Sequence, residues 1–274
     1  MTDRLAGLLN HYSLSARVFH SGALCGAKGF DRDHGYIHVL RQGPLEVSAE
    51  VHPPMRINEP CLLFYPRGAP HRFHAPAAAG ADLVCATVDL GSTSGNPLAL
   101  ALPEVLRISL EELPELSTTL DLLFAEAFAN HCGRQAAIDR LCEYLLIQLL
   151  RFLMDRGFAH GGLLAGLADP RLARAISAMH EAPAQDWSLE ALADRAGMSR
   201  ARFAARFREV VGQTPGHYLA AWRINVACSL LRQGRPVALA ADRVGYASAP
   251  ALARAFRAHL GCSPSEWLAQ RTTA

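Results

Sequence analysis

Lysine is nearly absent from this 274-residue sequence, because 26 of its 27 basic residues are arginine. It also has no run of about 20 apolar residues, the length that a membrane-spanning helix needs. The stretch LCEYLLIQLLRFLM, for example, is interrupted by Glu143, Gln148 and Arg151. The N-terminus, with an acidic residue at position 3, lacks the basic-then-apolar layout of a secretory signal. We therefore expect a cytoplasmic protein that does not enter a membrane.

The seven cysteines contain no CxxC pair, which argues against a zinc finger and against a secreted disulfide framework. We expect them to be thiols. The chain is long enough for two domains of ordinary size, each with its own apolar core.

Charge is divided unevenly along the chain. Residues 169–274 hold 14 arginines and 8 acidic residues, a net charge of +6, whereas residues 1–168 hold 13 basic and 17 acidic residues, a net charge of −4. The C-terminal part is therefore the candidate for binding a polyanion such as nucleic acid.

The last hundred residues contain an internal repeat. Residues 191–220 return as residues 239–269: ADRAG matches ADRVG, Pro215 matches Pro264, and Tyr218 matches Trp267. Each copy has the pattern of a helix-turn-helix, with a glycine to end the first helix and a serine to cap the second. These are Gly197 and Ser199 in the first copy, and Gly245 and Ser248 in the second.

The second copy, DRVGYASAPALARAFRAHLGCSPSEW, resembles the signature of the AraC/XylS family of bacterial transcription regulators, and the resemblance covers Asp169 to Gln270. It implies two helix-turn-helix units on a connecting helix, promoter DNA and RNA polymerase as partners, and no enzymatic activity. By the family pattern, the recognition helices enter successive major grooves about 34 Å apart.

The residues that match DNA-facing positions differ between the two copies. Arg254 matches a base-reading position, whereas the alanines of the first copy cannot form bidentate hydrogen bonds with bases. We expect Arg200, Arg202 and Arg206 to contact phosphates. The full candidate set is Arg200, Ala201, Arg202, Ala204, Ala205, Arg206, Ala249, Pro250, Ala253, Arg254 and Arg257.

Short β-like runs separated by Gly, Pro and Asp fill residues 15–90 and predict a sandwich or barrel. EPCLLFYPRGAPHRFHA resembles the second motif of a cupin barrel, and FHSGALCG and GYIHVL resemble cupin-type sensor domains. The expected fold class is therefore α+β: a cupin-like β-barrel and helical linker, followed by an all-α domain with two helix-turn-helix motifs. We expect a sensor domain at 1–110, a helical dimerisation region at 111–156, a hinge at 157–168 and the DNA-binding domain at 169–274.

In the cupin family that these motifs resemble, catalytic members usually carry an HxH pair of metal ligands. The pair is absent here because Val39 and Leu40 follow His38, so we do not expect an enzyme. The residues that remain are His38, Cys25 and Cys85 as candidate ligand or redox sensors, and His71 with His74 as candidate zinc or copper ligands. Cys25 and Cys85 would form a reversible disulfide only if their Cα atoms lay within about 7 Å. The alternatives are a buried core Cys85, histidines with only structural roles, and a small organic effector in the barrel.

In the linker, Ile138, Leu141, Leu145, Leu149 and Phe152 form an apolar stripe that packs either on a partner subunit, giving a homodimer, or on its own barrel. The sequence thus predicts a DNA-binding regulator, an activator or a repressor, that responds to a small molecule, an oxidant or a metal. The competing hypotheses are a cupin metalloenzyme with a DNA-binding tail and an architectural DNA-binding protein.

Overall fold

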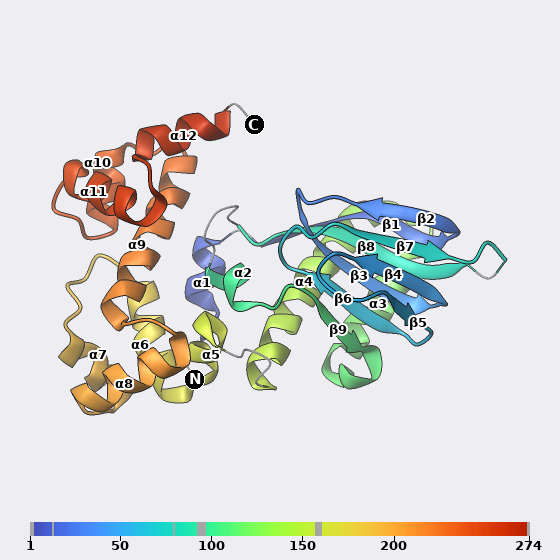
Figure 1. Cartoon of the computed structure of the whole chain (residues 1–274), viewed down its shortest axis with the longest axis horizontal. Coiled ribbons are helices and arrows are strands. Elements are labelled where there is room, and N and C mark those ends of the chain that lie inside the picture. The colour runs from blue at the N-terminus through green and yellow to red at the C-terminus, as the bar shows by residue number, and fades with distance from the viewer. Residues whose placement is uncertain (1–2, 13, 79, 92–96, 157–160, 273–274) are drawn as a thin grey trace. The chain divides into compact units, whose positions relative to one another are not determined.

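The computed structural model describes residues 3–12, 14–78, 80–91, 97–156 and 161–272 (Figure 1). These residues divide into two compact units. One unit contains residues 14–91 and 98–156, and the other contains residues 161–272 together with residues 3–12. None of the described helices is both long and apolar enough to cross a bilayer.

The first unit is a β-sandwich of two antiparallel sheets (Figure 1). One sheet has the order β1-β8-β3-β6-β9 and the other the order β2-β7-β4-β5. Among the described residues no hydrogen-bonded strand pair joins the sheets, so the expected barrel is an open sandwich. The strands are β1 (Ser15–Leu24), β2 (Gly26–Phe30), β3 (Gly35–Gln42), β4 (Leu45–Ala49), β5 (Met55–Ile57), β6 (Cys61–Tyr65), β7 (His71–Ala75), β8 (Ala81–Asp89) and β9 (Leu106–Ser109).

Side chains alternate across these strands, as a pleated strand requires. In β7, His71, Phe73 and Ala75 are buried, whereas Arg72 and His74 are exposed. Phe73 and Ala75 join a core that includes Leu40, Leu63, Tyr65, Leu83 and Cys85 from the facing sheet. The space between the sheets is therefore filled mainly by aliphatic and aromatic side chains.

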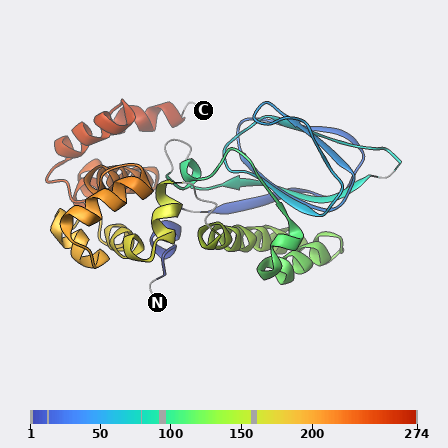
Figure 2. The same ribbon diagram turned by 60° about the horizontal axis from the view of Figure 1, so that its bottom comes forward.

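The helices of this unit are α2 (Pro97–Ala101), η1 (Leu110–Glu112), η2 (Pro114–Leu116), α3 (Ser117–Ala127) and α4 (Arg134–Asp155). Of these, α3 and α4 pack on each other and cover one face of the sandwich (Figure 2). α4 lies against β1, where the Asp139 carboxylate accepts from the Val18 N–H at 2.7 Å and the Gln135 amide donates to the Val18 carbonyl at 2.8 Å. These two bonds satisfy backbone groups of an edge strand that would otherwise be unpaired.

The apolar stripe of α4 packs within its own unit. Ile138, Leu145 and Leu149 are fully buried, Phe152 is nearly so, and Leu141 is half-buried. The stripe is therefore not available to a partner subunit. Of the two alternatives, packing on a partner or packing on its own domain, the second is found.

The second unit contains the C-terminal helices. They are α5 (Gly162–Ala168), α6 (Pro170–Glu181), α7 (Leu189–Ala196), α8 (Arg200–Val211), α9 (Pro215–Arg232), α10 (Val237–Arg243), α11 (Ala249–Leu260) and α12 (Pro264–Thr272). Residues 162–168, which we expected to be part of a hinge, form α5, and this helix buries Leu163, Leu164 and Leu167. Residues 157–160 of the expected hinge lie outside the described residues.

The N-terminal helix α1 (Ala6–His11) belongs to the C-terminal unit and not to the sandwich that follows it in sequence. Leu8 and Tyr12 are buried, and the Tyr12 ring meets Trp222 edge-on at 5.7 Å. A Cβ on Gly7 would lie 2.6 Å from Cβ of His180, so α1 approaches α6 at backbone distance. We expected a sensor domain at 1–110, but its first described residues, 3–12, belong to the other unit.

Candidate nucleic-acid interface and sensor residues

Each repeat forms a helix-turn-helix, as the sequence predicts. In the first, α7 ends at Gly197, whose φ of +65° is the left-handed conformation that glycine adopts without strain. In the second, Gly245 has a φ of +79°, and a Cβ there would lie 2.6 Å from the Ala184 carbonyl oxygen. The second turn thus has two independent reasons for glycine, its backbone conformation and its close neighbour.

The two serine caps differ. The Ser248 hydroxyl accepts from the Ala251 N–H at 3.3 Å and caps α11. Ser199 occupies the same position before α8, but its side chain makes no capping hydrogen bond. The sequence therefore placed both helix starts correctly, while the expected cap bond forms only in the second copy.

The second helix of each copy buries one stripe and exposes the other. Phe203 and Phe207 of α8 and Leu252 and Phe256 of α11 are buried. The candidate DNA-facing residues lie outside this stripe. Arg200, Ala201, Arg202, Ala205, Pro250, Arg254 and Arg257 are exposed, and Ala204, Arg206, Ala249 and Ala253 are half-buried.

The arginines of this surface differ in how far they are already engaged. Arg206 is paired with Asp169, Nε to Oδ2 at 3.2 Å, and with Glu209, Nη1 to Oε2 at 3.2 Å. Arg257 approaches the Glu266 carboxylate at 3.8 Å. Arg254 makes no ion pair with any described residue, so its guanidinium keeps all its donors for a ligand.

Arg223 in the middle of α9 is a structural residue that the sequence pattern did not indicate. Its Nε donates to the Pro183 carbonyl at 2.7 Å and its Nη2 to the Gln185 carbonyl at 2.8 Å. Its guanidinium also lies 5.9 Å from the ring centre of Tyr246, in the turn of the second copy. Arg223 thus ties the loop before the first helix-turn-helix to the second one.

In the sandwich, the register separates the two candidate redox cysteines. Cys25 is exposed and follows Leu24, which pairs with Ala81, whereas Cys85 lies four residues further along β8 and pairs with His20. Four residues of strand span about 13 Å, well beyond the ~7 Å limit for a disulfide. The distance condition for a Cys25–Cys85 disulfide is therefore not met in this fold, and of the alternatives for Cys85 the buried core residue is found. Burial also raises the pKa of the Cys85 thiol, which keeps it protonated.

The expected metal pair is wrong as well. His71 is buried and His74 is exposed, because residues three apart on a strand point to opposite faces. Within the described residues no group of three histidine, cysteine, aspartate or glutamate side chains has an arrangement that could hold a metal ion.

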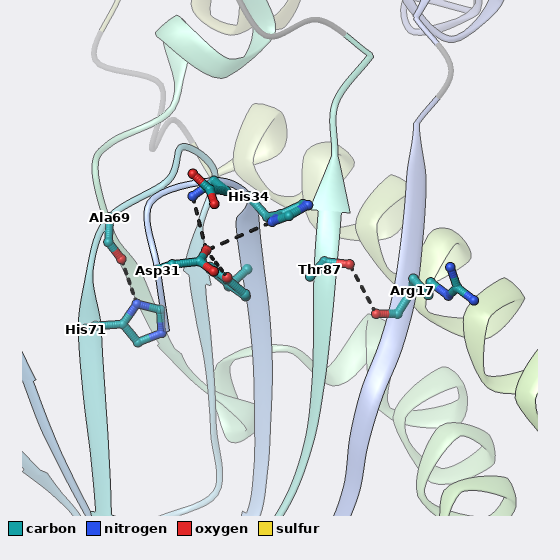
Figure 3. Close-up of polar contacts among 8 residues, drawn as sticks. Arg17, Asp31, His34, Ala69, His71 and Thr87 are labelled. Carbon is teal, nitrogen blue, oxygen red and sulfur yellow. Dashed lines mark hydrogen bonds and ion pairs between the residues drawn. The ribbon is translucent and has the colours of Figure 1, made fainter. Parts of the chain in front are cut away.

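His71 instead meets His38 from the facing sheet. Their Nε2 atoms are 2.9 Å apart. The His71 Nδ1–H donates to the Ala69 carbonyl at 2.8 Å (Figure 3). His71 Nε2 is consequently the acceptor and His38 Nε2–H the donor. The Tyr65 ring stacks on His71 at 4.0 Å and is itself bonded through its hydroxyl to His52 Nε2 at 2.8 Å.

Burial dominates the electrostatics of this pair. It lowers the pKa of His71 to about 4 and the pKa of His38 well below the usual range. Two further nitrogens, His38 Nδ1 and His20 Nε2, are buried without a hydrogen-bond partner among the described residues. The arrangement is a neutral, hydrogen-bonded histidine pair in an aromatic core, with no acidic side chain in it.

Comparison with known proteins gives matches over both units. Residues 3–155 match the family described as Cupin, and residues 192–270 match the family described as a helix-turn-helix domain. An uncharacterised HTH-type transcriptional regulator of Haemophilus influenzae is 30% identical over 260 residues, which cover 86% of this chain and 87% of the relative. RclR of Escherichia coli K12, named an RCS-specific HTH-type transcriptional activator, is 29% identical over 235 residues, 84% of this chain and 82% of the relative. A putative AraC-like transcription regulator of Streptomyces lividans is 43% identical over 131 residues, 47% of this chain and 43% of the relative.

The Cupin match spans more than half of the chain, and the Haemophilus relative is matched over most of its length. The helix-turn-helix match falls on the two repeats whose exposed arginines are described above. The chain therefore belongs to the AraC-type family of helix-turn-helix transcriptional regulators that carry an N-terminal cupin domain, and it is a DNA-binding regulator of transcription.

Proposed function

We propose that this regulator reads its promoter mainly through α11, and that Arg254 is the base-reading residue. The observation that carries the proposal is the state of Arg254, which is exposed and makes no ion pair with a described residue. The α8 residues that match base-reading positions are Ala201, Ala204 and Ala205, whose methyl groups can contact thymine but cannot form bidentate hydrogen bonds. A guanidinium fits O6 and N7 of guanine, so α11 has the readout chemistry that α8 lacks.

Arg254→Ala should weaken binding to the specific site by about 1–3 kcal/mol and leave binding to random DNA largely unchanged. The site is first obtained by selecting duplexes from a random library with the wild-type protein. Fluorescence anisotropy then compares the selected duplex with a shuffled one. The matched control is Arg257→Ala, on the same exposed face of α11, which should weaken both duplexes by the same factor. Equal losses on both duplexes for Arg254→Ala would reject the base-reading role.

We propose that a signal in the cytoplasm acts on the cupin-type unit. The signal binds to this unit or oxidises it, and the unit catalyses no reaction. The missing HxH pair and the mutual hydrogen bond of His38 and His71 support a regulatory rather than a metal-dependent catalytic role. Cys25 is exposed beside the strands of the sandwich, and we propose it as the residue through which an oxidant would act; Cys132, between α3 and α4, is the other exposed thiol of this unit. The Escherichia coli relative is named an RCS-specific activator, which favours activation, with RNA polymerase as the partner. A signal changes DNA binding only if it stabilises one arrangement of the protein over another.

We also propose a homodimer that uses the outer face of α3 and α4, since the inner stripe of α4 is buried. Leu122 and Tyr144 lie there with 55% and 47% of their surface exposed. Tyr144→Glu should convert a dimer to a monomer in analytical ultracentrifugation, because it puts a charge into an apolar contact. Leu100→Glu, at an exposed apolar position on α2 of the same unit, is the control and should leave the mass unchanged. A Tyr144→Glu protein that sediments as a dimer would exclude this face.

A further inference from the structure

A concave patch lies beside the first helix-turn-helix. It is a surface depression of about 410 Å³ lined by residues of the start of α6, the turn before α8 and the first turns of α8. Its lining residues are Asp169, Pro170, Arg171, Met198, Arg202 and Arg206. Three of the six carry a guanidinium group. Arg171 comes from α6 and the other two arginines from α8, so the two helices that supply these groups are separate in sequence.

One of these guanidinium groups is already neutralised. Arg206 pairs with Asp169 and Glu209, both at 3.2 Å, and Asp169 is fixed in turn, because its Oδ1 accepts from the N–H groups of Arg171 and Leu172. Arg206 is therefore held across the α6–α8 contact, and its role is to fix α8 against α6. We therefore assign Arg206 a positioning role in place of the phosphate contact that the sequence pattern suggested.

The other two guanidinium groups remain available. Arg171 and Arg202 are exposed, and neither forms an ion pair in the part of the chain that the structure describes. They face one depression from different helices, α6 and α8. A guanidinium donates two parallel hydrogen bonds to a phosphate, and two such groups around one hollow form a site for a single tetrahedral anion.

The depression also adjoins the helix that lacks base-reading side chains. Arg202 lies between Ala201 and the exposed Ala205 on α8, so a duplex that reaches these alanines also reaches Arg202. Binding by a helix that cannot read bases must come from the DNA backbone. Arg171 belongs to α6, outside the repeat, which is why the helix-turn-helix pattern did not indicate it.

We propose that Arg171 and Arg202 together bind one phosphate of the DNA backbone, and that Asp169 and Arg206 position α8 for this contact. The first helix-turn-helix then anchors the duplex while the second reads it. This inference rests on the proposed function, in which α11 reads the bases and α8 does not, and it adds a phosphate site that involves a residue outside both helix-turn-helix motifs.

The test measures the affinity for a random-sequence duplex as a function of salt concentration. Each phosphate contact contributes about 0.9 to the slope of log affinity against log salt. The double variant Arg171→Gln/Arg202→Gln should lower the magnitude of that slope by about 0.9, because both residues serve one phosphate. Each single variant should lower it by less, because the remaining guanidinium still contacts that phosphate. Arg174→Gln, with the same charge change one turn later on α6 and outside the depression, should keep the wild-type slope.

The outcomes separate this site from the function on which it rests. A double-variant slope equal to that of Arg174→Gln would overturn the site, provided the wild type binds with a steep slope. Additive losses of about 1.8 in the double variant would overturn the shared phosphate and indicate two separate contacts. A wild-type protein without salt-dependent DNA binding would instead contradict the DNA-binding role itself. Circular dichroism of every variant establishes that the helices are intact.

Discussion

Replacing Leu8 with alanine should destabilise the C-terminal unit by about 2–5 kcal/mol. Leu8 has 1% of its surface exposed, although it lies in a helix of only six residues at the start of the chain. A leucine truncated at such a site loses its transfer free energy and leaves a cavity, and the cost depends on how far the neighbours can collapse. The tight contact between Gly7 and His180 leaves little room for α1 to shift inward.

The neighbours of α1 explain why it belongs to this unit. His180 is fully buried, stacks on Trp222 at 3.7 Å and is bonded through Nε2 to the Tyr218 hydroxyl at 2.6 Å. The Tyr12 ring packs against the Trp222 ring in an edge-to-face contact, and the Arg4 guanidinium donates to the Leu167 carbonyl at 3.0 Å. Without α1, an aromatic cluster at the junction of α6 and α9 would be exposed to water.

Tryptophan fluorescence measures this unit selectively. All three tryptophans, Trp187, Trp222 and Trp267, lie in the C-terminal unit. Urea unfolding followed by fluorescence should show the midpoint of Leu8→Ala shifted to lower urea. Leu100→Ala is the matched control, since Leu100 is a leucine with 64% of its surface exposed in the sandwich unit. An unchanged fluorescence midpoint for Leu8→Ala would mean that α1 does not support the C-terminal helices.

The sequence could not assign α1 to this unit. A six-residue helix is too short for a periodic pattern, and such helices take their stability from tertiary packing rather than from their own residues. Helix ends, in contrast, are local: Gly197 and Gly245 carry the conformational requirement of the turn in their own identity. The double helix-turn-helix was therefore predictable from the repeat, and its N-terminal helix was not.

The same distinction applies to the candidate sites. The exposed arginines of α8 and α11 follow from helical periodicity, but the neutralisation of Arg206 depends on Asp169, 37 residues away. The separation of Cys25 and Cys85 depends on strand register, which no short-range pattern sets. The error over His74 was avoidable, since strand period alone places it on the opposite face from His71.

The sandwich should lose stability as the pH falls from 7 to 4, because the unfolded chain takes up a proton that folded His71 does not. The pKa of His71 is about 4 in the folded protein and about 6.5 in an unfolded chain. Between these values the unfolded state binds more protons at His71, so the contribution of His71 to stability rises with pH there and is constant above about 6.5 and below about 4. His71 alone accounts for a loss of about 2 kcal/mol at pH 5 relative to pH 7 and about 3 kcal/mol in total. His38, whose pKa is also lowered by burial, adds to the loss in the same direction.

The geometry gives the reason for the low pKa. His71 Nε2 accepts from His38 Nε2–H, so a proton on His71 would place two N–H groups 2.9 Å apart. The rings stacked on His71 are Phe30 and Tyr65, which cannot compensate a charge by ionising. The titratable groups that act on the pair are the basic side chains of Lys28, His20 and His52, and each of them disfavours a further positive charge.

Urea unfolding at pH 7 and at pH 5, followed by circular dichroism of the strands, measures this loss. Tryptophan fluorescence in the same experiment reports unfolding of the C-terminal unit, which does not contain His38 or His71. His38→Leu/His71→Leu should flatten the pH dependence of the strand transition, because the titrating pair is gone. His74→Leu, an identical change at the exposed position of the same strand, should keep it. A ring resonance of His71 that titrates near pH 6.5 in NMR would show that the pair accepts a proton without cost, and would contradict the expected acid sensitivity.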